Sequence, residues 1–121
     1  MKLYHLVPPD QWEQFKDHTF YAPPSLAQEV FIHCSSAEQV SASANRHFAG
    51  HSSLWLLVIN PEKVSARIVF EDLYGGGTEF PHIYGQLPIQ AIEAVIPLKP
   101  EVDGRFSFLP PKAFEAEGEN R

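Results

Sequence analysis

The sequence predicts a single α+β domain with a mixed or antiparallel sheet and two to three helices. Its 121 residues suffice for one hydrophobic core without disulfides or metals, and 44% hydrophobic with 20% charged residues is typical of a globular chain. Helical patterns come early and most strand patterns come late. Because no regularly spaced helices separate the strands, the order favours α+β over a doubly wound parallel sheet.

Short apolar segments bounded by proline, glycine or asparagine predict the strands. Leu54–Ile59 is a continuous apolar run of the kind that is buried on both faces of a sheet. The other expected strands are residues 2–7, residues 30–34, Arg67–Glu71, Phe80–Tyr84 and Ile92–Leu98, with residues 105–109 as a last edge strand. Residues 21–24, which contain two prolines, are expected to form a loop.

Two helices and a short turn are expected between the early strands. Asp10 is expected to begin a helix that turns Trp12 toward the core. Residues 35–39 have capping-box spacing, so a second helix is expected to start there and to end near Gly50. Residues 25–29 are expected to form a short turn.

No repeat or linker divides the chain, so residues 1–110 are expected to form one domain. Residues 111–121 are expected to be a polar tail that frays at the end of this domain.

The charge pattern argues against nucleic-acid partners, and the short apolar runs argue against a membrane span. The chain has a formal charge of −6, and its nine Lys+Arg residues are scattered, so none cluster to neutralise phosphates. No apolar run approaches the roughly 20 residues that span a bilayer. The N-terminus lacks the apolar stretch of a secretion signal, and the single cysteine has no disulfide partner. Together these features favour the cytoplasm.

Three of the six histidines, His5, His33 and His82, lie inside apolar strand segments, where an imidazole needs a hydrogen-bond partner. Strand alternation places His33 and Ser35 on one face, and His82 and Tyr84 on one face of a later segment. If these faces converge, the chain has a small-molecule pocket with polar groups on apolar walls. The alternative is that each histidine is a core group satisfied by its neighbours.

Two charged side chains are further candidates for this pocket. Glu71 ends an apolar strand, where it either orients a hydroxyl or stabilises a positive charge in the pocket, or is an exposed strand end. Arg46 is the basic residue best placed near the second strand to meet an anion, with solvent exposure as the alternative. The glycines at residues 75–77 predict a mobile loop, which is either a lid or a surface connection.

The sequence contains no local metal-binding spacing, since no His-x-His, Cys-x2-Cys or His-Glu-x-x-His run occurs. A site assembled from His5, His33 and His82 is the remaining metal alternative. Cys34 shares a strand face with Ile32, so it is expected to pack in the core rather than to act as a nucleophile. No nucleophile elbow, P-loop or dinucleotide fingerprint is present.

Two segments together carry a family resemblance: Phe-Ile-His-Cys-Ser at residues 31–35 and Phe-Pro-His-Ile-Tyr-Gly at residues 80–85. With Tyr-His-Leu at residues 4–6, the chain resembles, over about residues 3–106, the bacterial family named domain of unknown function 952. Val30 stands where this family usually has glycine. The family has no agreed activity.

By fold, this family is grouped with ADP-ribosyl transferases and RNA 2′-phosphotransferases. The resemblance therefore implies an ADP-ribosylation-like fold, with a bent, split sheet that grips NAD. It also implies that His5, His33, Ser35 and Arg46 lie where contacts to NAD or phosphate would be.

The leading interpretation is an NAD- or nucleotide-binding enzyme, with NAD as substrate or ligand. Tyr84 would stack on the nicotinamide, and His82 or Glu71 would assist glycosidic cleavage, because a carboxylate stabilises an oxocarbenium-like transition state. The alternative is a non-catalytic domain that binds a small metabolite or peptide, since residues 6–7 replace the Gly-Thr pair of the phosphotransferases. Hydrolase or transferase chemistry at Cys34, including glutathione-related chemistry, is a third interpretation.

Overall fold

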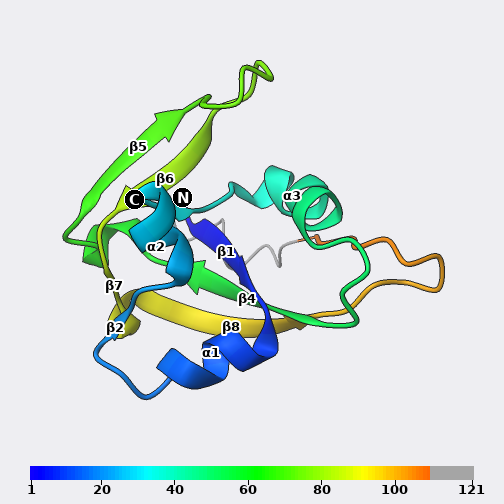
Figure 1. Cartoon of the computed structure of the whole chain (residues 1–121), viewed down its shortest axis with the longest axis horizontal. Coiled ribbons are helices and arrows are strands. Elements are labelled where there is room, and N and C mark those ends of the chain that lie inside the picture. The colour runs from blue at the N-terminus through cyan, green and yellow to red at the C-terminus, as the bar shows by residue number, and fades with distance from the viewer. Residues whose placement is uncertain (110–121) are drawn as a thin grey trace.

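The computed structural model describes residues 1–109, which form an α+β fold with antiparallel strand pairing (Figure 1). Its helices are α1 (Pro9–Phe15), α2 (Pro24–Glu29) and α3 (Val40–His47). Its strands are β1 (Leu3–Val7), β2 (Phe20–Tyr21), β3 (Ile32–His33), β4 (Leu54–Ile59), β5 (Arg67–Glu71), β6 (Phe80–Tyr84), β7 (Leu87–Pro88) and β8 (Ile92–Leu98). They make three sheets, ordered β1-β4-β8, β2-β7 and β3-β6-β5. The predicted fold class is confirmed.

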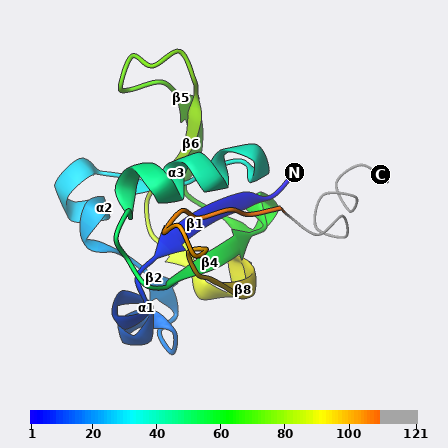
Figure 2. The ribbon, with the colours of Figure 1, turned by 90° about the vertical axis from the view of Figure 1, so that its right-hand side faces the viewer.

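In the β1-β4-β8 sheet, β1 and β4 are buried on both faces, because most of their successive residues are apolar. From β1, Leu3 and Val7 join one core, which also contains Trp12 of α1. Tyr4 and Leu6 join the other core, against α3. The expected double-sided burial of Leu54–Ile59 is confirmed, and Figure 2 shows α3 crossing this sheet.

An isolated bridge joins the first sheet to the third. The Tyr4 and Ser35 backbones exchange hydrogen bonds of 2.9 and 2.7 Å. Ser35 follows β3 closely, so this bridge brings β1 beside β3. As a result, His5 and His33, which are 28 positions apart in the sequence, lie side by side.

Two expected elements differ from the structure near the third sheet. Of residues 30–34, only Ile32–His33 pairs as a strand, because α2 extends to its C-cap at Val30. The expected loop at residues 21–24 begins with a tyrosine that belongs to β2, which pairs with β7. A two-residue strand has too short a pattern to be recognised in a sequence.

The prediction of an edge strand at residues 105–109 is wrong. Its backbone bonds to side chains of α3 rather than to a neighbouring strand. The Phe106 N–H donates to Asn45 Oδ1 at 2.7 Å, and Asn45 Nδ2 donates to the Phe106 carbonyl at 2.9 Å. The Phe108 N–H donates to Ser41 Oγ at 2.8 Å.

The glycine-rich loop between β5 and β6 folds around one carboxylate. Asp72 accepts hydrogen bonds from the backbone of Gly76 at 3.1 Å and of Gly77 at 2.7 Å. Whether this loop is a lid stays a prediction. Within the part of the chain that the structure describes, no helix is long and apolar enough to cross a membrane. The expected tail at residues 111–121 lies outside the described residues.

Val30 is the one described residue other than glycine with a positive φ, at 70°. A β-branched residue is strained in this left-handed conformation. We expect Val30→Gly to raise the free energy of unfolding by about 1 kcal/mol, measured by urea denaturation. Val102→Gly, at an exposed turn position without positive φ, is the matched control. Equal or opposite changes in the two variants would contradict strain at Val30.

Candidate functional site

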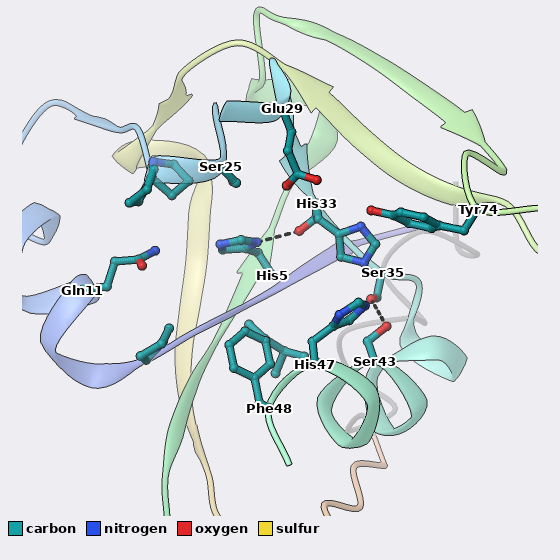
Figure 3. A pocket seen from close by; sticks show the side chains of 14 residues that line it. His5, Gln11, Ser25, Glu29, His33, Ser35, Ser43, His47, Phe48 and Tyr74 are labelled. Carbon is teal, nitrogen blue, oxygen red and sulfur yellow. Dashed lines mark hydrogen bonds between the residues drawn. The ribbon is translucent and has the colours of Figure 1, made fainter. Parts of the chain in front are cut away.

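A cavity of about 320 Å³ lies where β1, β3, α2 and α3 meet (Figure 3). Small-molecule pockets usually span roughly 300–1,000 Å³, so this one suits a small ligand. The more apolar part of the wall comprises Leu6, Pro8, Pro23, Pro24, Phe48 and Tyr74. The polar part of the wall comprises His5, Gln11, Ser25, Glu29, His33, Ser35, Ser43 and His47.

His5 is held by hydrogen bonds at both ring nitrogens. Its Nδ1 donates to the carbonyl oxygen of His33 at 2.6 Å, because a carbonyl can only accept. Nε2 therefore accepts from the Tyr21 hydroxyl at 2.8 Å, and that oxygen accepts from Gln11 Nε2 at 2.9 Å. Burial lowers the pKa of His5 to about 4, which keeps it neutral at neutral pH. His5 lines the cavity, but its nitrogens are already occupied by protein partners.

A chain of hydrogen bonds runs from the cavity wall into the third sheet. Nδ1 of His33 lies 3.2 Å from Nε2 of His82, and Nδ1 of His82 lies 2.9 Å from Oε1 of Glu71. The Tyr84 hydroxyl donates to the same carboxylate oxygen. His82 is fully buried and stacks on Phe31 with ring centroids 4.1 Å apart. We call Glu71, His82 and His33 the relay.

When both imidazole rings of the relay are neutral, its hydrogen bonds determine which nitrogen of each ring carries the proton. The ionised Glu71 can only accept, so His82 Nδ1 donates to it and His82 Nε2 becomes an acceptor. His33 Nδ1 then donates to that nitrogen, which leaves Nε2 of His33 with a lone pair. This Nε2 is buried and has no hydrogen-bond partner within residues 1–109. In Figure 3, the His33 ring lies between Tyr74 and His47 at the cavity.

The electrostatic surroundings support a neutral His33 and an ionised Glu71. Burial, and then the neighbouring His82, lowers the pKa of His33 to about 4. Hydrogen bonds from Tyr84, and then from His82, lower the pKa of Glu71. A neutral His33 at the cavity is therefore connected through His82 to an ionised carboxylate.

The cavity lining contains one carboxylate, Glu29, and no Lys or Arg among the described residues. Arg46 instead borders an adjoining hollow of about 70 Å³, which shares His33 and Tyr74 with the cavity wall. The Arg46 guanidinium lies 5.9 Å from the centroid of the Tyr74 ring, within cation–π range. The cavity interior therefore suits a neutral or cationic group, and an anion fits better at the Arg46 edge.

Two serines offer a hydrogen-bond donor to a ligand. The hydroxyls of Ser35, after β3, and Ser43, on α3, lie 2.9 Å apart. Only one of their two hydroxyl hydrogens is used between them, because a hydroxyl donates once. The second is not used between them, and both serines line the cavity.

The structure brings together part of the predicted site. Three of the predicted contact residues line the cavity, namely His5, His33 and Ser35, and Arg46 borders the adjoining hollow. The expected convergence of the two strand faces on one pocket is wrong, because His82 and Tyr84 do not line the cavity. Glu71, the other predicted catalytic residue, does not line it either. The β3–β6 register places His82 directly opposite His33, so the two rings lie side by side, with centroids 5.3 Å apart, and only the His33 ring lines the cavity.

Several lining residues were missed from the sequence, among them Glu29, Ser43, His47 and Tyr74. Ser43 and His47 are four residues apart in the expected helix, so they share a helix face, which was a usable signal. Glu29 and Tyr74 carry no such signal, because only tertiary contacts bring α2 and the β5–β6 loop to the cavity.

Cys34 packs in the core with Ile32, as expected. Burial raises the pKa of its thiol, which keeps it protonated and unreactive, so the structure favours the packing interpretation over cysteine catalysis. Within residues 1–109, no three His, Cys, Asp or Glu side chains are grouped to hold a metal ion.

The family model described as "Protein of unknown function (DUF952)" matches residues 6–95, which include the relay. The chain belongs to this family. The predicted family resemblance is confirmed by this match. No curated protein matches this DUF952 chain.

The DUF952 chain is also similar to solved structures of protein CC0527 from Caulobacter crescentus. A crystal structure matches with a TM-score of 0.78 at 25% identity, covering 88% of this chain and 94% of that chain, and a double mutant gives the same values. A solution NMR structure matches with a TM-score of 0.67 at 25% identity, covering 86% and 90%. The name of that protein states no activity, so the expected kinship with ADP-ribosyl transferases stays a prediction.

Proposed function

We propose that the protein binds a small organic molecule in the cavity and that the ligand donates a hydrogen bond to Nε2 of His33. The observation that carries this proposal is that His33, which lines a cavity of about 320 Å³, has a buried Nε2 without a hydrogen-bond partner among the described residues. Leaving such a group unpaired costs about 1–3 kcal/mol, which a donor on the ligand regains. His5 cannot serve in this way, because both of its nitrogens are occupied.

The composition of the cavity wall restricts the chemical classes of ligand that fit. The rings of Phe48 and Tyr74 provide apolar contact, and the serine pair supplies a donor. Glu29 is the charged side chain of the lining. These features favour a neutral or cationic ligand with hydroxyl or amino groups, such as a sugar, a nucleoside or an amine.

An NAD-type nucleotide is the second candidate, and Arg46 is the observation that favours it. A nucleoside in the cavity would place its phosphates toward the adjoining hollow that Arg46 borders. A ribose hydroxyl would then donate to His33. If the ligand is NAD, Glu71 would not contact it during a transferase reaction, because Glu71 does not line the cavity.

Thermal shifts with sugars, nucleosides, amines, NAD, ADP-ribose and glutathione test both candidates. A ligand at 100 times its dissociation constant stabilises the protein by about 2.7 kcal/mol. We expect His33→Phe to weaken binding by about tenfold or more, since it removes one hydrogen bond in a buried site. His18→Phe, an exposed histidine outside the cavity, should leave binding unchanged.

Arg46→Gln separates the two candidates within the same experiment. If phosphates lie at Arg46, this change should weaken the binding of NAD and ADP-ribose and leave the binding of uncharged nucleosides unchanged. Stabilisation by none of these compounds, or equal binding by wild type and His33→Phe, would contradict the proposed function.

A further inference from the structure

We propose that the cavity is a catalytic site in which His33 acts as a general base, with His82 and Glu71 as its positioning residues. This inference rests on the proposed function, because the proton must come from a ligand that reaches Nε2 of His33. Its basis is geometric: hydrogen bonds of 3.2 and 2.9 Å connect a carboxylate through two imidazoles to a nitrogen without a partner in residues 1–109.

A buried histidine is a poor base, and the relay compensates for this by providing a second site for the positive charge. A positive charge on His33 alone is unfavourable, because the ring is largely removed from water. His82 offers a second place for that charge, directly opposite on the neighbouring strand. There, the charge lies beside Glu71, whose carboxylate is 2.9 Å from Nδ1 of His82. An opposite charge at this separation offsets part of the cost of burying a protonated imidazole.

The proton transfer balances without any co-reactant. A ligand O–H, N–H or C–H bond breaks, its electron pair stays on the ligand, and the proton binds Nε2 of His33. The proton on Nδ1 of His33 passes to Nε2 of His82. The other His82 proton stays on Nδ1, hydrogen-bonded to Glu71. Reversal of these transfers returns a proton to the product or to water and restores the starting state.

The rings are held in the orientation that this transfer requires. His82 is fully buried and stacked on Phe31, and the Tyr84 hydroxyl holds the Glu71 carboxylate. On the other side, His5 bonds to the backbone carbonyl of His33. Such supporting contacts are typical of sites in which a base is positioned before the ligand binds.

A purely structural histidine pair would leave a different pattern. Two core histidines satisfy one another, and each remaining ring nitrogen finds a partner in the protein or in ordered water. His82 meets this expectation, since both of its nitrogens are bonded. His33 does not, because its unpartnered Nε2 belongs to a ring in the cavity wall. The relay therefore ends at a residue that lines the cavity.

Kemp elimination of 5-nitrobenzisoxazole tests the base without the natural substrate. A base removes the carbon-bound proton of this compound, the N–O bond breaks, and a coloured phenolate is released. The wild-type protein should accelerate this reaction by at least about tenfold over His33→Phe, since positioned bases contribute about 10²–10⁴-fold on their own substrates. His18→Phe should keep the wild-type rate, and an equal rate for wild type and His33→Phe overturns the proposal.

The Glu71→Gln variant tests whether Glu71 positions the base or only stabilises the fold. The amide keeps the shape of the side chain but removes the charge beside His82. We expect a lower maximal rate and a rate–pH midpoint displaced by about 1–3 pH units toward acid, because the protonated pair is less stable without the carboxylate. Glu101→Gln, on an exposed turn, is the matched control. A lower rate with an unmoved midpoint overturns the positioning role of Glu71.

NMR of the protein labelled with ¹⁵N at histidine gives a readout that needs no reaction. At neutral pH, we expect Nδ1 of His33 to carry the proton and Nε2 to be unprotonated. A protonated Nε2 overturns the proposal. Thermal shifts that persist while the Kemp test fails would remove the general base and leave the binding site intact. If no compound shifts the melting temperature of the wild-type protein, both the binding site and the general base are refuted.

Discussion

Acidification from neutral pH to about pH 4 is expected to lower the free energy of unfolding by several kcal/mol. Burial lowers the pKa of His5 and of His33 from 6.5 to about 4 in the folded protein. The unfolded chain therefore binds protons more readily in this range, and falling pH favours unfolding. The difference of about 2.5 units corresponds to about 3 kcal/mol for each histidine. This stability is fully present above pH 6.5 and is lost toward the folded pKa of about 4.

Urea unfolding at successive pH values measures this loss. The carboxylates with lowered pKa, such as Glu71 and Asp72, lose their contribution in a more acidic range, so the early part of the decline reports the histidines. In His33→Phe, this early decline should be shallower, because one of the two groups is gone. His18→Phe should follow the wild-type curve. Parallel curves for wild type and His33→Phe would contradict a neutral, buried His33.

The longer strands were predictable because their apolar patterns are self-contained. Leu54–Ile59 and Phe80–Tyr84 have the bounds that their residues indicate. The two-residue strands depend instead on partners that are distant in the sequence, as Phe20–Tyr21 depends on Leu87–Pro88. Residues 105–109 look like a strand, but Asn45 and its helix occupy their backbone groups. Short patterns of this kind are decided by tertiary contacts.

The candidate site was predictable in composition but not in arrangement. Strand alternation correctly placed His33 and Ser35 on one face toward the cavity. Alternation along a single strand gives no information on cross-strand register, which places His82 directly opposite His33. For this reason, His82 was expected in the pocket and Glu71 was a candidate for it, whereas both connect to the cavity only through His33.

His82→Ala is expected to lower the free energy of unfolding by about 3–5 kcal/mol, measured by urea denaturation. The change removes a fully buried ring that stacks on Phe31 and leaves a cavity in its place. It also removes the hydrogen-bond partner of His33 Nδ1 and one partner of Glu71. His51→Ala, at an exposed histidine, should change stability by no more than about 0.5 kcal/mol. Similar small losses in both variants would contradict a structural role for His82.

His82→Phe separates packing from hydrogen bonding at this position. The phenyl ring fills the same space and can stack on Phe31, but it cannot bond to His33 or Glu71. We expect a smaller loss, of about 1–3 kcal/mol, from the polar groups left without a partner. Because the packing is kept, this variant should remain folded while its relay is broken. A folded His82→Phe protein with an undiminished Kemp rate would show that His82 serves the fold alone, whereas a diminished rate would assign the ring a second role in the chemistry of His33.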